Sequence, residues 1–386
     1  MKKTTLAGLI SMLAFFLRTY VAYVGPIEND EVINATSAVK FNLAIRKGDW
    51  TQILRSTYNI EHPQFYKLVY AFGLMAVKPI PSTVFKDSGV DLQSGGYWDE
   101  LLRMISVFFG TATVFLVSLI NPIAGLFLAI NTYAIKYTSV IYFEALPMFT
   151  SLAALMAALN TLKAYQNSSK NWKKWIGWLV ISSLFLGMTA ASKYMYSLVG
   201  IVIIISIIIQ GWKYKSATLM GLMGWGLLAI AFFFLFDPIL WHSPLSELIK
   251  SVNYHLNYSS GRWVTRVGYP FWQPIKWLMI SIPQQHYVHR AFNITNGEYF
   301  ILADSIIFIL ALLGLPDLFK RNRPMFIWLV VGLAFLLLWG SKWPQYILMV
   351  LVPFCISSAY GFQFIRMALI KLKSRRNDSS KSTPIG

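Results

Sequence analysis

The chain has 386 residues, of which 56% are hydrophobic and 13% are charged, and its mean hydropathy is +0.53. A soluble protein usually carries charge on about 25% of its residues, so this composition excludes a cytosolic enzyme and a disordered chain and favours a polytopic membrane protein. The net charge of +18 fits basic loops on the inner side of a membrane better than nucleic-acid binding, because no soluble module presents the basic residues together. One cysteine, Cys355, excludes an intramolecular disulfide and a cysteine-based metal cluster.

Continuously apolar runs predict membrane helices, because the strands of a membrane barrel would alternate in polarity. Several runs approach the ~20 residues that a helix needs to cross about 30 Å of hydrocarbon. In chain order the runs are 5–24, 64–77, 101–120, 122–134, 145–162, 175–191, 194–210, 217–236, 299–315, 325–340 and 345–365.

Basic residues predict which ends of these runs face the cytoplasm. The first run follows Lys2 and Lys3 and lacks a small-x-small cleavage site, so we expect an uncleaved anchor with its N-terminus inside. Further basic residues place four more segments inside: 163–174, 213–215, 320–323 and the tail 366–386. The two long polar segments, 25–63 and 237–298, then lie on the outer side.

This topology needs an odd number of spans before the second outer loop, whereas eight runs precede residue 237. Run 122–134 is the weakest, because it is short and interrupted by Asn131 and Lys136. We therefore expect it to be re-entrant or peripheral on the outer side, and 64–77 to be the second span. The predicted divisions are a core module (1–236, with the outer loop 25–63), a large outer loop (237–298), C-terminal transmembrane helices (299–365) and a basic cytoplasmic tail (366–386).

Acidic residues gather where the first span reaches the outer side. Glu28, Asp30 and Glu31 occupy three of four positions, although acids also stabilise an ordinary helix start. His62 precedes the second run and Glu144 opens the run 145–162, where each also has a structural explanation.

Three cations do not fit a simple membrane anchor. Lys193 and Lys342 each lie between two runs on the outer side, against the positive-inside trend, and Arg18 lies inside the first run. A charge placed deep in the bilayer costs about 2.5–3.5 kcal/mol, so these residues are candidates for binding an anionic ligand. A lysine at the membrane edge can equally extend to the head groups.

The loop 237–298 is net basic, with Arg262 and Arg266 among its cations, and it is rich in aromatic residues. Aromatic residues are common at membrane surfaces, and they also stack on sugar faces. His286 and His289 are spaced to share a metal ion, but no third ligand is indicated. Cations that bind a phosphate, with a carboxylate that takes a proton from a hydroxyl, suit a reaction between an anionic lipid head group and a hydroxylic acceptor.

The order of these features resembles the GT-C superfamily of polytopic glycosyltransferases, in particular the protein O-mannosyltransferases and the lipid A aminoarabinose transferases (glycosyltransferase family 39-like). The matching features, in chain order, are Arg18 before Asp30-Glu31, His62-Pro63, Arg103, Glu144 where the family commonly has Asp, Lys193, Pro238-Ile239-Leu240-Trp241, and Lys342 with Tyr346 and Pro353.

The resemblance implies an all-α GT-C fold with about 10–11 transmembrane helices and two long extracytoplasmic loops. It implies an enzyme of the plasma membrane that moves a sugar from a polyprenyl-phosphate donor to a hydroxylic acceptor on the extracytoplasmic side. The acceptor class stays open between protein, lipid and glycan. The transfer would be a single in-line displacement that inverts the anomeric carbon.

The resemblance also implies roles for individual residues. Asp30 would be the catalytic base, with Glu31 and Glu144 orienting the acceptor, a cation or the base. Lys193 and Lys342 would lie near the donor phosphate. The other implied substrate-binding residues are His62, Tyr346, Arg18, Arg262 and Arg266. No cofactor is required, and a divalent cation held by the carboxylates stays open.

Two alternatives remain at this stage. A transporter or flippase of a lipid-linked anionic solute would show internal repeats and charges near the middle of the membrane, whereas the acids here gather at one surface. A catalytically inactive assembly subunit would share the architecture without the chemistry.

Overall fold

The computed structural model describes residues 2–56, 58–78, 80–81, 84–86, 89–92, 97–167, 172–211, 215–281 and 298–381. Most of these residues are helical. Two short strands, β1 (Phe85–Lys86) and β2 (Gly89–Val90), pair antiparallel in the segment that precedes residue 98.

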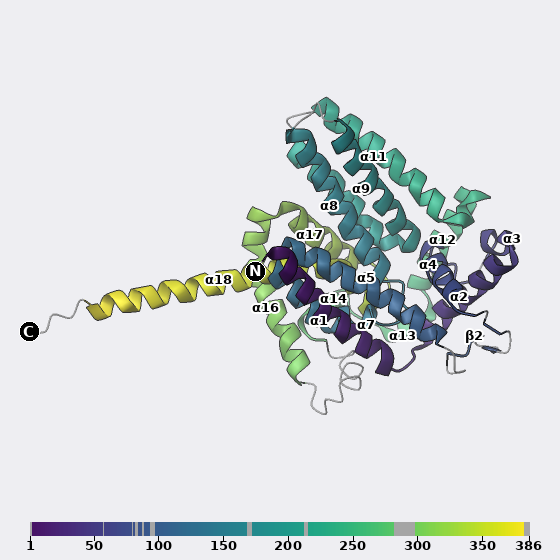
Figure 1. Cartoon of the computed structure of the whole chain (residues 1–386), viewed down its shortest axis with the longest axis horizontal. Coiled ribbons are helices and arrows are strands. Elements are labelled where there is room, and N and C mark those ends of the chain that lie inside the picture. The colour runs from purple at the N-terminus through teal and green to yellow at the C-terminus, as the bar shows by residue number, and fades with distance from the viewer. Residues whose placement is uncertain are drawn as a thin grey trace, which may run out of the picture.

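Long apolar helices form a bundle (Figure 1). They are α1 (Lys3–Val24), α5 (Trp98–Ile120), α8 (Ala145–Asn167), α9 (Trp172–Ser192), α10 (Val199–Gly211), α11 (Lys215–Phe236), α16 (Glu298–Arg321), α17 (Arg323–Leu338) and α18 (Leu348–Lys381). Within the described ranges, eight helical segments are long and apolar enough to cross a membrane, and α17 is apolar but shorter. The prediction of an all-α polytopic membrane protein is confirmed. The expected count of ten to eleven spans included runs 64–77, 122–134 and 325–340, and these three runs form helices shorter than those eight segments.

Shorter helices connect the bundle and cover one of its ends. They are α2 (Asn29–Lys47), α3 (Trp50–Leu54), α4 (Phe65–Gly73), α6 (Pro122–Ile130), α7 (Thr132–Tyr137), α12 (Pro244–Ser259), α13 (Arg262–Val267) and α14 (Gln273–Met279), with 3₁₀ turns η1 (Leu74–Ala76), η3 (Tyr194–Leu198), η5 (Pro238–Trp241) and η6 (Pro344–Ile347). Figure 1 shows α8, α9 and α11 side by side, and the distal part of α18 projecting from the bundle.

Contacts between α1 and α5 define the two ends of the bundle. Arg103, near the start of α5, donates to the carbonyls of Ala22 and Gly25 at the end of α1 (2.7 and 2.9 Å). At the opposite end, Lys3 Nζ donates to the carbonyl of Ile120 (3.1 Å). We call the end at Gly25 the site end and the end at Lys3 the basic end.

The chain from α6 to α8 runs between these two ends. α6 follows α5 at the basic end, and Arg18, near the middle of α1, donates to the carbonyl of Ala129 (3.2 Å). The backbone N–H of Ile141 then reaches the Glu31 carboxylate at the site end (2.9 Å). The expectation that run 122–134 is peripheral on the outer side is therefore wrong.

The second expected span, 64–77, does not cross the bundle. α4 has nine residues, which at 1.5 Å per residue span about 14 Å. It lies beside α2, where Arg46 donates to the carbonyls of Leu74 and Val77 (2.9 and 2.6 Å), so this segment stays at the site end. The odd number of crossings is preserved, because α6 and α7 return the chain to the site end in place of 64–77.

The polar break that weakens the sequence signal at 122–134 is a helix junction. Asn131 has an extended backbone (ψ 129°), and its side-chain oxygen accepts from the N–H of Ala134 (3.0 Å), which caps α7. Packing against α1, α5 and α18 buries this junction inside the protein. Irregular backbone at membrane depth is tolerated where protein surrounds it.

A separate apolar cluster fixes α2 and α4 to the bundle. Val39 of α2 and Tyr66 and Tyr70 of α4 pack with Leu102 of α5 and with Phe143, which precedes α8. This cluster holds the start of α2 beside the segment that leads into α8.

Candidate active site

A cavity of about 430 Å³ opens at the site end of the bundle. Two lysines line it, Lys136 and Lys193, together with three carboxylates: Glu28, Asp30 and Glu61. Much of the remaining wall is aromatic: Tyr137, Tyr142, Phe143, Tyr258, Trp263, Tyr269, Trp343 and Tyr346. Four of the residues that the sequence nominated meet here: Asp30, His62, Lys193 and Tyr346.

The start of α2 gives its two adjacent acids different environments. Glu31 is fully buried and accepts from the Arg103 guanidinium (2.9 and 2.6 Å) and from the N–H of Ile141 (2.9 Å). It also closes a capping box, because the N–H of Glu28 donates to its Oε1 (3.1 Å). Adjacent helical residues project about 100° apart, so burial of Glu31 is consistent with Asp30 lying at the cavity wall. Glu31 positions α2 and does not line the cavity.

Asp30 is accessible from the cavity, and its carboxylate is partly desolvated by the walls. This desolvation raises the pKa of Asp30 above its usual range, and the negative charge of Glu28 raises it further. The nearby hydroxyl of Tyr142 and the charges of Lys193 and Lys136 act in the opposite direction. A carboxylate with a raised pKa is a stronger base when it is ionised, which suits proton removal from a hydroxyl.

Lys136 is a site residue that the sequence reasoning missed. It is buried on α7, and its Nζ forms an ion pair with Glu28 Oε1 (2.6 Å), while Tyr142 donates to the other oxygen of Glu28 (2.8 Å). In the sequence, Lys136 follows the weak run 122–134 closely and indicates an interruption of that run, with no sign of a cavity. The structure makes it a cavity cation.

Lys193 connects the cavity to a buried carboxylate. Its Nζ donates to Glu144, which is fully buried and also accepts from the hydroxyl of Tyr196 (2.7 Å). The same Nζ lies 5.2 Å from the ring centre of Tyr346, which favours the cation electrostatically. Glu144 does not line the cavity; its hydrogen bond and ion pair hold the Lys193 side chain in place.

Four of the nominated cations are not at the cavity. Arg18 is buried, and its guanidinium donates to the hydroxyl of Thr138 (2.7 Å) and to backbone carbonyls of α1 and α6, so its role is to join these helices. Lys342 donates to the carbonyls of Leu337 (3.2 Å) and Trp339 at the end of α17, and it lines a separate pocket of about 220 Å³. Two arginines of α13 are exposed and do not line the cavity: Arg262 and Arg266.

The loop before α4 brings Glu61 and His62 to the cavity through a buried lysine. Lys67 Nζ donates to the carbonyls of Asn59 and His62 (2.6 and 2.7 Å), and Asn59 has a left-handed backbone (φ 53°), which Asn tolerates well. Burial, followed by the charge of Lys193, lowers the pKa of His62 well below its usual value, so its ring is neutral.

A buried aspartate fixes the junction between α6 and α7. Asp304 of α16 accepts from the side chain of Asn131 (2.9 Å) and from both the N–H (3.3 Å) and the hydroxyl of Thr132. Because α7 carries Lys136, this network positions a cavity cation from about 170 residues away in sequence. The sequence offered one clue, a carboxylate inside an apolar run, which is costly unless it is paired.

A second, mostly apolar pocket of about 340 Å³ adjoins the cavity. Its apolar lining includes Leu198, Val252, Leu256, Phe335 and Trp339. The two spaces share Glu61, His62, Lys193, Tyr258 and Tyr346. Lys193 therefore stands between a polar, aromatic chamber and an apolar one.

The described residues contain no group of three or more His, Cys, Asp or Glu side chains placed to hold a metal ion. His286 and His289 lie outside the described residues. The carboxylates nearest to such an arrangement are Glu28 and Asp30, and Glu28 is already paired with Lys136.

The chain matches no protein-family model and no curated protein. Among solved structures it resembles ArnT from Cupriavidus metallidurans bound to undecaprenyl phosphate (TM-score 0.58, 14% identity, 95% of this chain and 63% of that one). It also resembles the Archaeoglobus fulgidus oligosaccharyltransferase (TM-score 0.57, 11% identity, 100% of this chain and 53% of that one).

The chain has the GT-C fold. A further Archaeoglobus fulgidus structure, of the oligosaccharyltransferase AglB with an inhibitory peptide and a dolichol-phosphate, agrees (TM-score 0.53, 12% identity, 97% of this chain and 52% of that one). At these identities the likeness concerns the fold. The chain spans between about half and two thirds of the length of these proteins.

Proposed function

We propose that this GT-C chain is an integral-membrane inverting glycosyltransferase that moves a sugar from a polyprenyl-phosphate donor to a hydroxylic acceptor. The observation that carries the proposal is the meeting of Asp30 and Lys193 in one cavity that adjoins an apolar pocket. Two proteins of the same fold support the donor class, since their structures contain undecaprenyl phosphate and a dolichol-phosphate.

The donor fits the two adjoining spaces by polarity. Its prenyl chain would occupy the apolar pocket beside Phe335 and Trp339, and its sugar the aromatic cavity. The phosphate would then lie at the boundary, where Lys193 stands. A lysine ammonium has three N–H donors, of which Glu144 accepts one, so the others are available to phosphate oxygens.

The reaction then follows from these positions. Asp30 accepts the proton of the acceptor hydroxyl as its oxygen attacks the anomeric carbon. The bond between that carbon and the phosphate oxygen breaks, and the electron pair leaves with the polyprenyl phosphate. Lys193 stabilises the charge on the leaving phosphate, an effect typically worth 10²–10³ in rate for one well-placed donor. Proton removal by Asp30 contributes typically ~10²–10⁴.

The site end is proposed to face away from the cytoplasm. Lys3, Lys173 and Lys174 near the start of α9, and Lys320 and Arg321 at the end of α16 belong to the opposite, basic end. Lys and Arg near the ends of spans favour the cytoplasmic side. The plasma membrane is the proposed location.

Reconstitution tests the proposal. The full chain is placed in liposomes with radiolabelled polyprenyl-phosphate sugars and a mixture of protein, lipid and glycan acceptors. We expect label to move from the lipid to one acceptor class, with release of polyprenyl phosphate. Movement of intact donor across the bilayer without cleavage would contradict the enzyme and favour a transporter. Mass spectrometry of glycans and glycolipids from a deletion strain would then name the sugar and the acceptor.

A further inference from the structure

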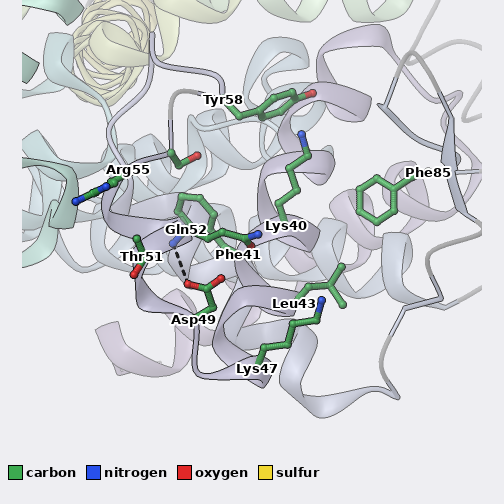
Figure 2. Close-up of a pocket in the computed structure, with 11 residues that line it drawn as sticks. Lys40, Phe41, Leu43, Lys47, Asp49, Thr51, Gln52, Arg55, Tyr58 and Phe85 are labelled. Atoms are coloured by element: carbon green, nitrogen blue, oxygen red, sulfur yellow. Dashed lines mark hydrogen bonds between the residues drawn. The ribbon is translucent and has the colours of Figure 1, made fainter.

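A second polar pocket, of about 720 Å³, lies further along α2 than the cavity (Figure 2). We propose that it binds the acidic groups of an extended glycan acceptor whose reacting hydroxyl lies in the cavity. This inference rests on the proposed function, because it assigns the acceptor of that same reaction. It concerns residues of α2, α3 and the following loop that have no part in the cavity.

The pocket carries an excess of positive charge. Lys40, Lys47 and Arg55 line it and are exposed, and in the ranges that the structure describes none of them forms an ion pair. Among the described lining residues the one carboxylate, Asp49, caps α3 by accepting from the backbone N–H of Gln52 (3.3 Å; dashed line in Figure 2). Within the part of the chain that the structure describes, the pocket therefore presents cations that no carboxylate pairs with.

The basic residues of the pocket have no topological explanation. They lie in the first outer loop, at the end of the bundle away from the basic connections, so the positive-inside trend does not account for them. Lys47, in the last turn of α2, and Arg55, the C-cap of α3, also lie where a cation favours a helix dipole, but Lys40, in the middle of α2, does not. An anionic ligand gives Lys40 a function and gives the other two cations a second one.

The other lining groups fit a sugar better than an acyl chain or a peptide. Thr51, Gln52 and Ser56 offer hydroxyl and amide groups that pair with sugar hydroxyls, and the ring of Phe85 offers an apolar face. Lys40 Nζ lies 3.9 Å from the ring centre of Tyr58, which holds this cation over the pocket (Figure 2). Phe41 and Leu43 are the other apolar lining residues, whereas the lipid-sized pocket near Lys193 has a longer apolar lining that includes Leu198, Val252, Leu256, Phe335 and Trp339.

Two features connect this pocket to the cavity. Ile33 lines the cavity, and Ile33, Lys40 and Lys47 recur every seven residues, which places them on one exposed face of α2. From Asp30 to Lys40 the helix rises about 15 Å, so an acceptor must reach at least that far to occupy both spaces.

The second connection is the loop 58–62. Tyr58 lines the pocket, whereas Glu61 and His62 line the cavity. Between them the amide of Asn59 donates to the side-chain oxygen of Asn34, itself a cavity residue (3.1 Å). One segment thus forms part of both walls, which fixes the two spaces relative to each other.

Direct binding tests the inference without requiring transfer. The full chain in detergent is titrated with acidic oligogalacturonates of increasing length, with neutral maltooligosaccharides, with polyglutamate and with anionic lipid vesicles. We expect the acidic oligosaccharides to bind most tightly, and their binding to weaken as salt is raised. Equal binding of neutral chains, or tighter binding of polyglutamate or of vesicles, would overturn the assignment.

Variants locate the binding and separate it from catalysis. The double variant Lys40→Gln/Arg55→Gln should weaken oligogalacturonate binding by at least about fivefold, because two charge contacts are lost. Lys276→Gln, an exposed lysine of α14 outside the pocket, is the matched control and should bind as the unmodified chain does. Unchanged binding by the double variant overturns the inference. The double variant should transfer sugar to a short neutral acceptor as the unmodified chain does. If the unmodified chain binds oligogalacturonates but transfers no sugar, the proposed function is refuted and the binding assignment is not.

Discussion

The buried ion pair between Lys193 and Glu144 has a structural role and a proposed catalytic role, and a double-mutant cycle separates them. Lys193→Met leaves a fully buried carboxylate that keeps its hydrogen bond from the Tyr196 hydroxyl but loses the cation, and Glu144→Leu leaves a buried ammonium without its carboxylate. Removing one member of a buried pair typically costs about 3–5 kcal/mol, whereas replacing both by apolar residues is often close to neutral. We expect the double variant to be more stable than the sum of the single effects by about 3 kcal/mol.

Donor binding should follow a different pattern from stability. A charge-assisted hydrogen bond to phosphate is worth about 1.5–3 kcal/mol, so loss of Lys193 should weaken donor binding by about 10- to 100-fold. The assays are chemical unfolding in detergent and equilibrium binding of a polyprenyl-phosphate sugar, with Lys276→Met as the matched control. The double variant should regain stability without regaining donor affinity. A double variant that binds donor as the unmodified chain does would refute the phosphate role of Lys193.

Three further predictions use groups around the site. Glu28→Gln should move the acid limb of the pH–rate profile to lower pH, because Asp30 must be ionised to act and the charge of Glu28 raises its pKa; a limb that moves upward would contradict this. Asp304→Leu should destabilise the fold by at least about 1–3 kcal/mol and reduce donor binding, whereas Asp304→Asn keeps an acceptor for the α6–α7 junction and should retain most of both; equal losses would count against the positioning role. Burial raises the pKa of Asp237 to about 7 from its ordinary 3.8, so the folded state holds this proton more tightly than the unfolded state and stability falls as pH rises from about 4 to about 7. Asp237→Asn should flatten that decline in thermal unfolding, and an unchanged pH dependence would show that another group causes it.

The apolar runs predicted most of the long helices, because an uninterrupted run of sufficient length has few alternatives in a membrane. The prediction failed where length and polarity conflicted. Run 64–77 is apolar but packs on α2, and run 122–134 is interrupted by Asn131 but lies inside the bundle, where neighbouring helices satisfy its polar groups. Composition along the chain cannot show which faces a neighbour will cover.

A place at the cavity wall was predictable where charges lie close to the end of an apolar run, as at Asp30 and Lys193. It was not predictable where the partner lies far away in sequence. Arg18 and Lys342 carry the same signal as Lys193, but carbonyls of adjacent helices occupy their donors. Lys136 carries a weaker signal, yet its pairing with Glu28 brings it to the cavity wall. For Arg18 and Lys136 the outcome depends on contacts more than 100 residues away in sequence, whereas Lys342 is held by carbonyls three and five residues before it.

The most direct test of the account is a comparison of chemistry and donor binding in Asp30→Asn. If Asp30 is the base and Lys193 holds the phosphate, this variant should bind the polyprenyl-phosphate sugar with nearly unchanged affinity. Its single-turnover transfer rate should fall by about 10²–10⁴. Transfer at the rate of the unmodified chain would contradict the central claim that the cavity wall supplies a proton-accepting carboxylate at residue 30.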